Sequence, residues 1–268
     1  MHRGILSFLW KLALVILVIF LLAGYISTIP LTFLPEKSTP DLQLLKLSED
    51  FLYEVKTGKQ TNAEQKLSTL TTDSLLQGLT NDASKKVFWL NIYNGWFQLL
   101  AGRDQWKVPD IFTKKVIRFK DRNFSLDEIE HGILRKYRWK YSLGYLPHFF
   151  VPGVIKQLAV RELDYRIHFA LNCGAKSCPA IAFYTLDQLN QQLDLATENF
   201  MAGETTIDHN RKIITTSKIL DWYSGDFGGS KGIKIMVGNV FLQNLTDYKL
   251  TFKTYDWTAN LGNYVKEF

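Results

Sequence analysis

The chain has 268 residues, of which 46% are hydrophobic and 14% aromatic, so we expect one large or two small folded domains and not a disordered chain. Its net charge is +6, with acidic and basic residues interspersed. The densest basic run, residues 135–140, contains Tyr and Trp that could stack on bases. A solvated helix end explains this run as well, and nucleic acid is therefore not a predicted partner.

The N-terminal segment predicts a membrane partner. Residues 12–25 carry no charge and, with their apolar flanks, are long enough to cross a bilayer, which takes about 20 residues. Basic residues precede this stretch and none follows until Lys37, which predicts a cytoplasmic N-terminus and a domain on the extracytoplasmic side. A cleaved signal peptide is the alternative. We therefore expect a single-pass membrane protein, with residues 1–29 as anchor or signal peptide, 30–44 as tether and 45–268 as the folded domain.

Three helices are expected before residue 110. The spacing of Leu and Phe predicts the first over residues 41–56 and the second over residues 62–79. The third, residues 82–100, is apolar around most of its circumference, which predicts a buried central helix. Asn91 and Asn94 lie one turn apart in it. Their amides either tie this helix to neighbouring loops or include one that binds a substrate carbonyl.

A further helix is predicted to begin at the Ser-x-x-Glu capping box of Ser125 and Glu128. Glu130 falls inside its apolar stripe, and His131 lies at the edge of that stripe. A carboxylate on a buried face is costly unless it is paired. Glu130 or Asp127 is therefore a candidate partner that orients the imidazole of His131 and raises its basicity. A histidine in a surface salt-bridge cluster is the alternative.

Residues 166–179 hold both cysteines of the chain. Apolar and polar residues alternate over residues 167–171, which predicts a strand with two different faces, one of which carries His168. Cys173 and Cys178 follow the predicted strand. In an oxidising compartment the two cysteines could pair as a disulfide, and this possibility stays open at the sequence level.

The remaining elements complete an α+β fold. We expect a single mixed domain whose helices pack on a central sheet, with a papain-like or transglutaminase-like core and a membrane helix in front of it. The predicted sheet contains the strands near residues 115, 168, 213 and 252. The helices expected after the cysteines cover residues 185–201 and 231–245.

Five segments together resemble the family of domains of unknown function 547 (DUF547). The resemblance extends from about residue 45 to the C-terminus, and it implies no particular reaction because the activity of the family is not settled. The segments are residues 88–94 (FWLNIYN), 124–131 (FSLDEIEH), 166–179 (RIHFALNCGAKSCP), 221–227 (DWYSGDF) and 255–260 (YDWTAN).

The residues favour a cysteine-dependent hydrolase or transferase that acts on amide or thioester bonds. Cys178 precedes Pro179, and proline is common at the first position of a helix, where free N–H groups stabilise a thiolate and could hold an oxyanion. Cys178 is therefore the predicted nucleophile, and Cys173 is predicted to be more buried and inert. His131 is the preferred base, and His168 is the alternative.

Two other functions remain open. The first is a non-catalytic module that binds a peptide or glycan of the cell envelope through exposed aromatic residues. The second is a thiol–disulfide couple, which the four residues between the cysteines disfavour, since redox pairs usually have two. No metal or other cofactor is predicted. The aromatic candidates are Trp222, Tyr223, Tyr145 and Trp257, and the predicted substrate-binding amides are Asn91, Asn94 and Asn172.

Overall fold

The computed structural model describes residues 11, 14–15, 39–59, 62–102 and 109–266. The predicted membrane-spanning segment, residues 12–25, lies almost entirely outside the described residues. Among those that are described, no helix has the length and apolar character needed to span a bilayer. The predictions of a membrane helix in the fold and of a single-pass, extracytoplasmic localisation are therefore not supported.

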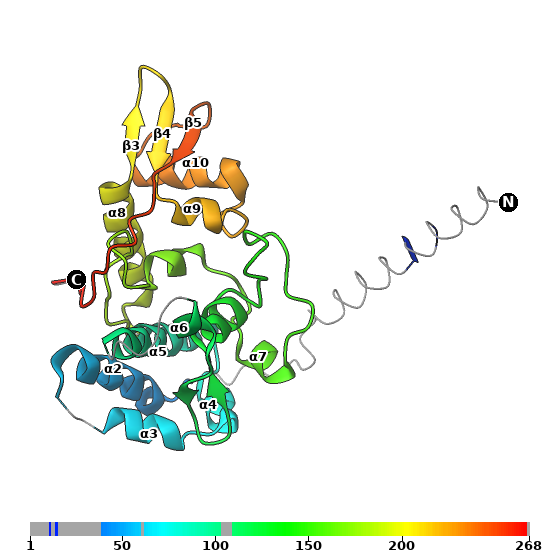
Figure 1. The fold of residues 1–268 in the computed structure, drawn as a ribbon, viewed down its shortest axis with the longest axis vertical. Coiled ribbons are helices and arrows are strands. Elements are labelled where there is room, and N and C mark those ends of the chain that lie inside the picture. Colours follow the sequence, from blue (N-terminus) through cyan, green and yellow to red (C-terminus); the bar gives the residue numbers. More distant parts are fainter. Residues whose placement is uncertain (1–10, 12–13, 16–38, 60–61, 103–108, 267–268) are drawn as a thin grey trace.

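The first half of the domain consists of helices that pack around one of their number (Figure 1). α2 (Leu42–Thr57) begins at Leu42 because Asp41 caps it: the Asp41 side chain accepts hydrogen bonds from the N–H groups of Gln43 and Leu44. The helix thus starts inside the segment that was assigned to a tether. α3 (Ala63–Thr69) and α4 (Thr72–Gly78) follow. α5 (Asp82–Gly102) packs along α2 and is buried on almost all sides, as its apolar sequence predicts.

The middle of the chain consists of short elements. α6 (Asp110–Thr113) precedes β1 (Ile117–Arg118), which pairs antiparallel with β2 (Asn123–Phe124). The predicted capping box is confirmed, since the Glu128 N–H donates to Oγ of Ser125 and the Ser125 N–H donates to Oε2 of Glu128. The helix after it, η1 (Glu128–Leu134), is a π-helix. α7 (Gly153–Leu158) and the 3-10 helix η2 (Tyr165–Phe169) follow.

The predicted strand over residues 167–171 is wrong, because most of this segment belongs to the 3-10 helix η2. Residues 167–171 are all buried, so both sides of this segment contact protein. An alternating pattern distinguishes a strand only when one face is exposed to water. Here the polar residue of the pattern, His168, is buried as well, because its ring bonds to Asp226.

The last part of the chain forms a small mixed sheet. α8 (Leu189–Glu204) leads into β3 (Thr206–Asp208), which pairs antiparallel with β4 (Ile213–Thr216). β5 (Lys249–Phe252) pairs parallel with β4 after a crossover. Two helices form that crossover: α9 (Ile219–Trp222) and α10 (Gly229–Val240).

The predicted central sheet is therefore wrong. The described strands form one two-stranded and one three-stranded sheet, at different places in the molecule. Segments near residues 115 and 213 do not share a sheet, and the segment near residue 168 is helical. The fold remains a mixture of helices and strands, but helices supply most of the packing.

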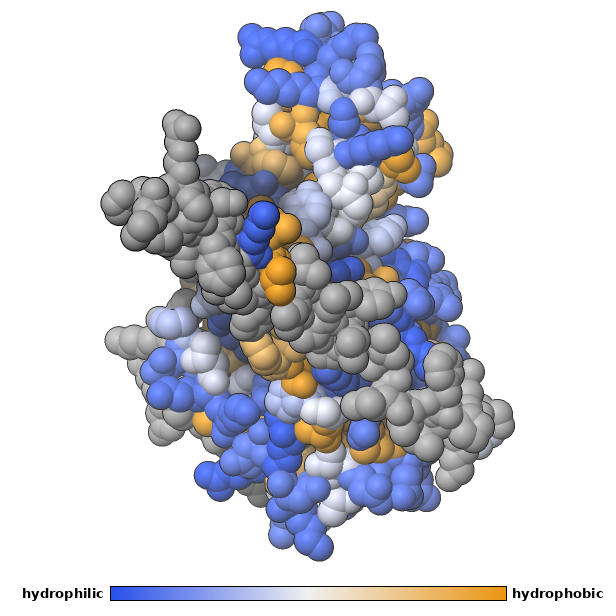
Figure 2. Space-filling view, turned by 90° about the vertical axis from the view of Figure 1, so that its right-hand side faces the viewer, coloured by the Kyte–Doolittle hydropathy of each residue, from blue (hydrophilic) through white to orange (hydrophobic). Residues whose placement is uncertain are grey.

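Two hydrophobic clusters organise the domain. One is built mainly from α2, α5, β1, β2 and η1, and the other from the end of α8 with β4, α9, α10 and Tyr255. In Figure 1 the helical cluster is at the bottom and the sheet is at the top. Figure 2 shows that the outer end of the sheet is hydrophilic, in line with the exposed turn at residues 209–212. The main cavity of the site lies in the region between these two clusters.

Asp164 is expected to contribute stability that is lost in acid. Lys86 and Arg166 donate to its carboxylate, at 2.7 and 2.8 Å. Burial alone raises the pKa of Asp164, but these hydrogen bonds overcome that effect and lower the pKa from 3.8 to about 2. Because the folded pKa lies below the unfolded one, the contribution is present above pH 4 and disappears as the pH falls toward 2. It amounts to about 2 kcal/mol.

Urea unfolding of the wild type and Asp164→Asn at several pH values measures this contribution. The free-energy difference between the two proteins should narrow by about 1 kcal/mol between pH 7 and pH 3. A difference that stays constant over this range would show that the carboxylate is not stabilised in the folded state.

Candidate functional site

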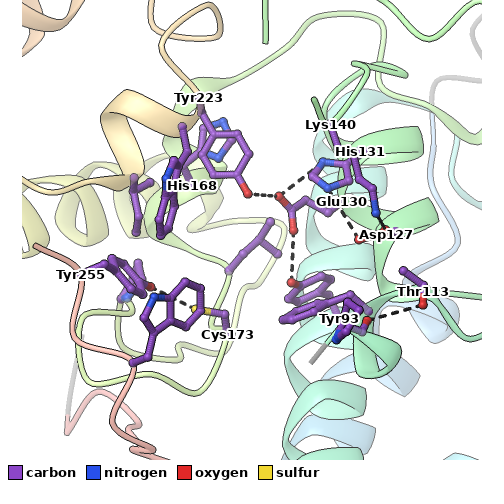
Figure 3. A pocket seen from close by; sticks show the side chains of 17 residues that line it. Tyr93, Thr113, Asp127, Glu130, His131, Lys140, His168, Cys173, Tyr223 and Tyr255 are labelled. Carbon is purple, nitrogen blue, oxygen red and sulfur yellow. Dashed lines mark hydrogen bonds and ion pairs between the residues drawn. The ribbon is translucent and has the colours of Figure 1, made fainter. Parts of the chain in front are cut away.

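A cavity of about 340 Å³ lies between the two hydrophobic clusters (Figure 3). Its walls come from α5, α6, η1, η2, α9 and the segment after β5. Of the predicted catalytic residues, Glu130, His131, His168 and Cys173 line it, whereas Cys178 does not. These four residues come from two segments that are distant in sequence, residues 130–131 and residues 168–173, and the fold brings them together.

Glu130 lies at the centre of the polar groups in Figure 3. It is only 8% exposed, and its two carboxylate oxygens accept hydrogen bonds from Tyr223, at 2.8 Å, and Tyr93, at 3.2 Å. Burial alone raises the pKa of Glu130, but His131 whenever its ring is protonated, the permanent charge of Arg135 and the Tyr223 hydroxyl lower it. Glu130 is therefore a charged carboxylate at neutral pH, and each of its oxygens retains a lone pair for a ligand.

His131 is held as a neutral imidazole. Arg135 Nη1 lies 2.7 Å from Nδ1 of His131, and an arginine can only donate, so Nδ1 is the acceptor. The ring proton of the neutral form is then on Nε2, 3.7 Å from Asp127 Oδ1. Burial and the Arg135 charge lower the pKa of His131 against the opposing effect of Glu130. Although Nδ1 is 3.5 Å from Glu130 Oε1, this nitrogen has no proton to give to that carboxylate.

A second, fully buried group of charges supports the first. Asp226 Oδ2 accepts hydrogen bonds from Arg135 Nε at 2.6 Å and from His168 Nε2 at 2.9 Å. Burial and the charge of Arg135 lower the pKa of His168, although the hydrogen bond to Asp226 opposes this shift. His168 is therefore neutral, and its Nδ1 is left as an acceptor. The ring of Tyr223 stacks on His168, with centroids 4.1 Å apart, and Arg135 lies over the same ring.

Aromatic rings form the opposite wall of the cavity. Trp222, Tyr255 and Trp257 contact one another, with ring centroids 4.6 to 5.7 Å apart, and all three line the cavity. Tyr223 also lines it, so three of the four aromatic residues that the sequence singled out meet here. The fourth, Tyr145, is 55% exposed and lines neither of the two cavities at this site.

A second cavity, of about 300 Å³, adjoins the first. The two share Asp127, His131 and Lys140, and Lys140 donates a hydrogen bond to the Asp127 carboxylate. The second cavity is otherwise lined largely by the chain between η1 and α7, which includes aromatic residues and the apolar residues next to α7. Several of those aromatic side chains are exposed: Trp139, Tyr141 and Phe150.

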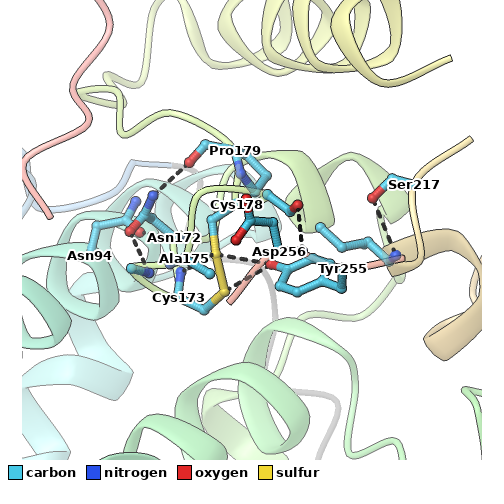
Figure 4. Close-up of a disulfide and its surroundings, with 12 residues drawn as sticks. Asn94, Asn172, Cys173, Ala175, Cys178, Pro179, Ser217, Tyr255 and Asp256 are labelled. Atoms are coloured by element: carbon cyan, nitrogen blue, oxygen red, sulfur yellow. Dashed lines mark hydrogen bonds between the residues drawn. A yellow bond between two sulfur atoms is a disulfide. The ribbon is translucent and has the colours of Figure 1, made fainter. Parts of the chain in front are cut away.

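Cys173 and Cys178 are joined by a disulfide, which resolves the alternative that the sequence left open (Figure 4). Cys178 is 5% exposed, whereas Cys173 is partly exposed, the reverse of the predicted burial. Cys178 therefore has neither the free thiol nor the access that the predicted nucleophile needs. Its predicted base, His131, lies in the cavity that Cys178 does not line.

The three predicted substrate-binding amides are structural. Asn91 exchanges two hydrogen bonds with the backbone of Tyr184, and Asn94 bonds to the Ala170 carbonyl and the Asn172 N–H. Asn172 in turn donates to the carbonyl of Pro179. All three are fully buried and line neither cavity. The alternative role, in which amides tie α5 to neighbouring loops, accounts for Asn91 and Asn94.

Several residues of the site were missed at the sequence level. Arg135 was assigned to a solvated helix end, but it is completely buried. Asp226 lies in the aromatic segment 221–227, whose Ser-Gly-Asp turn was a usable signal for a polar group among core residues. Tyr93 and Tyr255 could not be distinguished from the other aromatic core residues. In the described part of the chain, no set of three or more His, Cys, Asp and Glu side chains is placed to hold a metal ion.

Residues 76–201 match the model of a family described as "Protein of unknown function, DUF547". This match confirms the resemblance to that family over just under half of the chain, a narrower span than expected. Residues 221–227 and 255–260 lie outside it. No curated protein and no solved structure matches the chain, so the expected papain-like or transglutaminase-like core has no support from this comparison.

Proposed function

We propose that this chain, which resembles the DUF547 family over residues 76–201, is a binding module for peptides that present a primary ammonium group. The observation that carries the proposal is the buried, charged carboxylate of Glu130 in a cavity with aromatic walls. The module acts by holding the peptide and does not react with it at Glu130.

The balance of charges around the cavity favours a cationic ligand. Asp226 is paired with Arg135, and Asp127 is paired with Lys140. Glu130, by contrast, is hydrogen-bonded by two neutral tyrosine hydroxyls, and neighbouring His131 is neutral. A buried carboxylate is stabilised by a cation that both pairs with it and donates hydrogen bonds. An ammonium group does this, and the surrounding aromatic faces add cation–π attraction.

The second cavity favours a peptide over a glycan. It continues from the first across the Asp127–Lys140 pair, so an extended ligand held at Glu130 reaches it directly. Its lining is mainly aromatic and apolar, with Val151 and Pro152 among its residues. A peptide offers a lysine side chain to one cavity and an apolar side chain to the other. The repeating hydroxyls of a glycan match these two chemistries less well.

A cysteine-dependent hydrolase or transferase is less favoured because it needs a free thiol. Both sulfurs of the chain are in one disulfide. The His168–Asp226 pair has the geometry of an oriented base. While the Cys173–Cys178 disulfide is intact, however, no cysteine thiol is available to it as a nucleophile. The binding function requires no such group.

Glu130→Gln is expected to remove the preference for an ammonium group. The probe is an array of N-acetylated hexapeptides with lysine or acetyl-lysine at one position and Leu or Phe at the others. In the wild type, the lysine forms should bind at least tenfold more tightly. Because the amide of Gln carries no charge, the preference should be lost in the variant, as measured by calorimetry on the best array hits.

The matched control is Glu49→Gln, which removes a charge on α2, away from the cavity, and should leave the affinity unchanged. Equal binding of lysine and acetyl-lysine peptides by the wild type would contradict the proposal. If the wild type binds oligosaccharides and not peptides, and Glu130→Gln abolishes that binding, the ligand is a glycan and not a peptide.

A further inference from the structure

We propose that the Cys173–Cys178 disulfide takes part in thiol–disulfide exchange with a small thiol that enters the 340 Å³ cavity, with Cys173 as the attacked sulfur and Cys178 as the leaving group. This activity does not depend on the proposed peptide binding, because any thiolate of suitable size suffices. Two independent features of the site carry the inference: the access to the two sulfurs and the two backbone hydrogen bonds that the Cys178 sulfur receives.

Access to the two sulfurs is unequal. Cys173 lines the cavity and is partly exposed, whereas Cys178 is buried and does not line it. Thiolate attack occurs at a sulfur that the attacking group can reach. A thiolate inside the cavity therefore meets Cys173 first.

The hydrogen bonds to Cys178 favour its departure as a thiolate (Figure 4). Its Sγ accepts from the backbone N–H groups of Cys173, at 3.2 Å, and Ala175, at 3.4 Å. The Tyr255 hydroxyl lies 3.1 Å from the sulfur of each cysteine. Burial raises the pKa of Tyr255, so this hydroxyl keeps its proton and can donate it in a hydrogen bond. Donors that surround a sulfur lower the pKa of its thiol, and a thiol of low pKa leaves faster.

The short loop that connects the cysteines makes this arrangement possible. Gly174 has a φ of +74°, which lets the chain turn so that two backbone N–H groups face the Cys178 sulfur. The sequence spacing argued against a redox pair because it lacks the two-residue interval. The turn removes that objection by placing the two Cα atoms 6.0 Å apart despite four intervening residues.

The step is balanced without another oxidant. The incoming thiolate forms an S–S bond to Cys173, the Cys173–Cys178 bond breaks, and its electron pair remains on Cys178. The disulfide is itself the oxidant, and a second small thiol that attacks the mixed disulfide leaves the protein as a dithiol and releases the small disulfide. In the reverse sequence, a small disulfide oxidises the protein dithiol back to the Cys173–Cys178 disulfide and is itself reduced to two small thiols.

The full chain with glutathione tests the direction of attack. After exposure at neutral pH, free thiols are blocked with N-ethylmaleimide and the protein is digested with trypsin. Cleavage after Lys176 separates the two cysteines, since Cys173 falls in residues 167–176 and Cys178 in the next peptide. Glutathione is expected on the Cys173 peptide and maleimide on the Cys178 peptide. Glutathione mainly on Cys178, or an adduct that forms only after unfolding, would overturn the proposal.

Tyr255→Phe tests the leaving group, because it removes the hydroxyl and keeps the ring. The rate of glutathione addition should fall at least threefold relative to the wild type. Tyr264→Phe is the control, since that residue stacks on Phe183 and lines neither cavity, and its rate should not change. Equal rates in wild type and Tyr255→Phe, with both variants folded by circular dichroism, would show that the hydrogen bonds to Cys178 do not assist its departure.

Discussion

Replacing Arg135 with Met is expected to lower the free energy of unfolding by about 3–5 kcal/mol. The side chains of Arg135 and Asp226 are 1% and 0% exposed and are joined by a 2.6 Å hydrogen bond. Methionine occupies the space of the arginine stem but leaves the carboxylate buried without its permanent cation. Removing one member of a buried ion pair is more damaging than removing both, because the remaining charge has no compensation.

Urea unfolding of Arg135→Met measures this loss. Arg211→Met is the control: its ion pair with Asp208 is on the surface, with the arginine side chain 80% exposed, so the change should stay within about 0.5 kcal/mol. The double variant Arg135→Met, Asp226→Leu should recover part of the stability. The pKa of His168, followed by NMR, should rise in Arg135→Met because the guanidinium charge that opposes its protonation is gone. A loss below 1 kcal/mol would show that Asp226 is not a buried charge.

Gly225→Val is expected to destabilise the domain by about 3 kcal/mol and to separate two parts of the site. A Cβ atom at Gly225 would lie 2.5 Å from the backbone of both Gly144 and Tyr145. The Gly225 N–H also donates to the carbonyl of Leu143 at 2.7 Å. This contact joins the chain that lines the second cavity to the turn that carries Asp226. The clash with a Cβ atom cannot be relieved by a rotamer change, because the atoms that it meets belong to the backbone.

Two measurements check this expectation: urea unfolding, and limited proteolysis of the exposed segment 139–150. The segment should be cut faster in Gly225→Val because its contact with the Asp226 turn is lost. Gly203→Val is the control, since nothing lies within 4 Å of the Cβ position there. Wild-type stability and wild-type cleavage in Gly225→Val would mean that the two segments do not pack as described.

Some features of this protein follow from local sequence alone. The continuous apolar surface of residues 82–100 requires burial on all sides, and α5 is the central helix. The capping box at Ser125 and Glu128 forms because both partners lie within one turn. The position of Glu130 in an apolar stripe predicted a buried carboxylate with partners, and that carboxylate is the centre of the cavity. In each case the pattern that gave the prediction lies within one short segment, although the tyrosines that bond to Glu130 come from elsewhere in the chain.

Other features depended on the tertiary structure because their partners are distant in sequence. Tyr223, whose hydroxyl donates to Glu130, is 93 residues away from it in the sequence. Asp226, which pairs with the buried Arg135, is 91 residues away from that arginine. Local pattern could not separate a buried 3-10 helix from a strand at residues 167–171, because all five residues are buried and no exposed face reveals the period. Which cysteine faces the cavity was likewise decided by the tertiary structure, in which Cys173 lines the cavity and Cys178 does not. Sequence patterns report which residues are buried, whereas the identity of the partner on the other side of the interface is set by how distant segments pack.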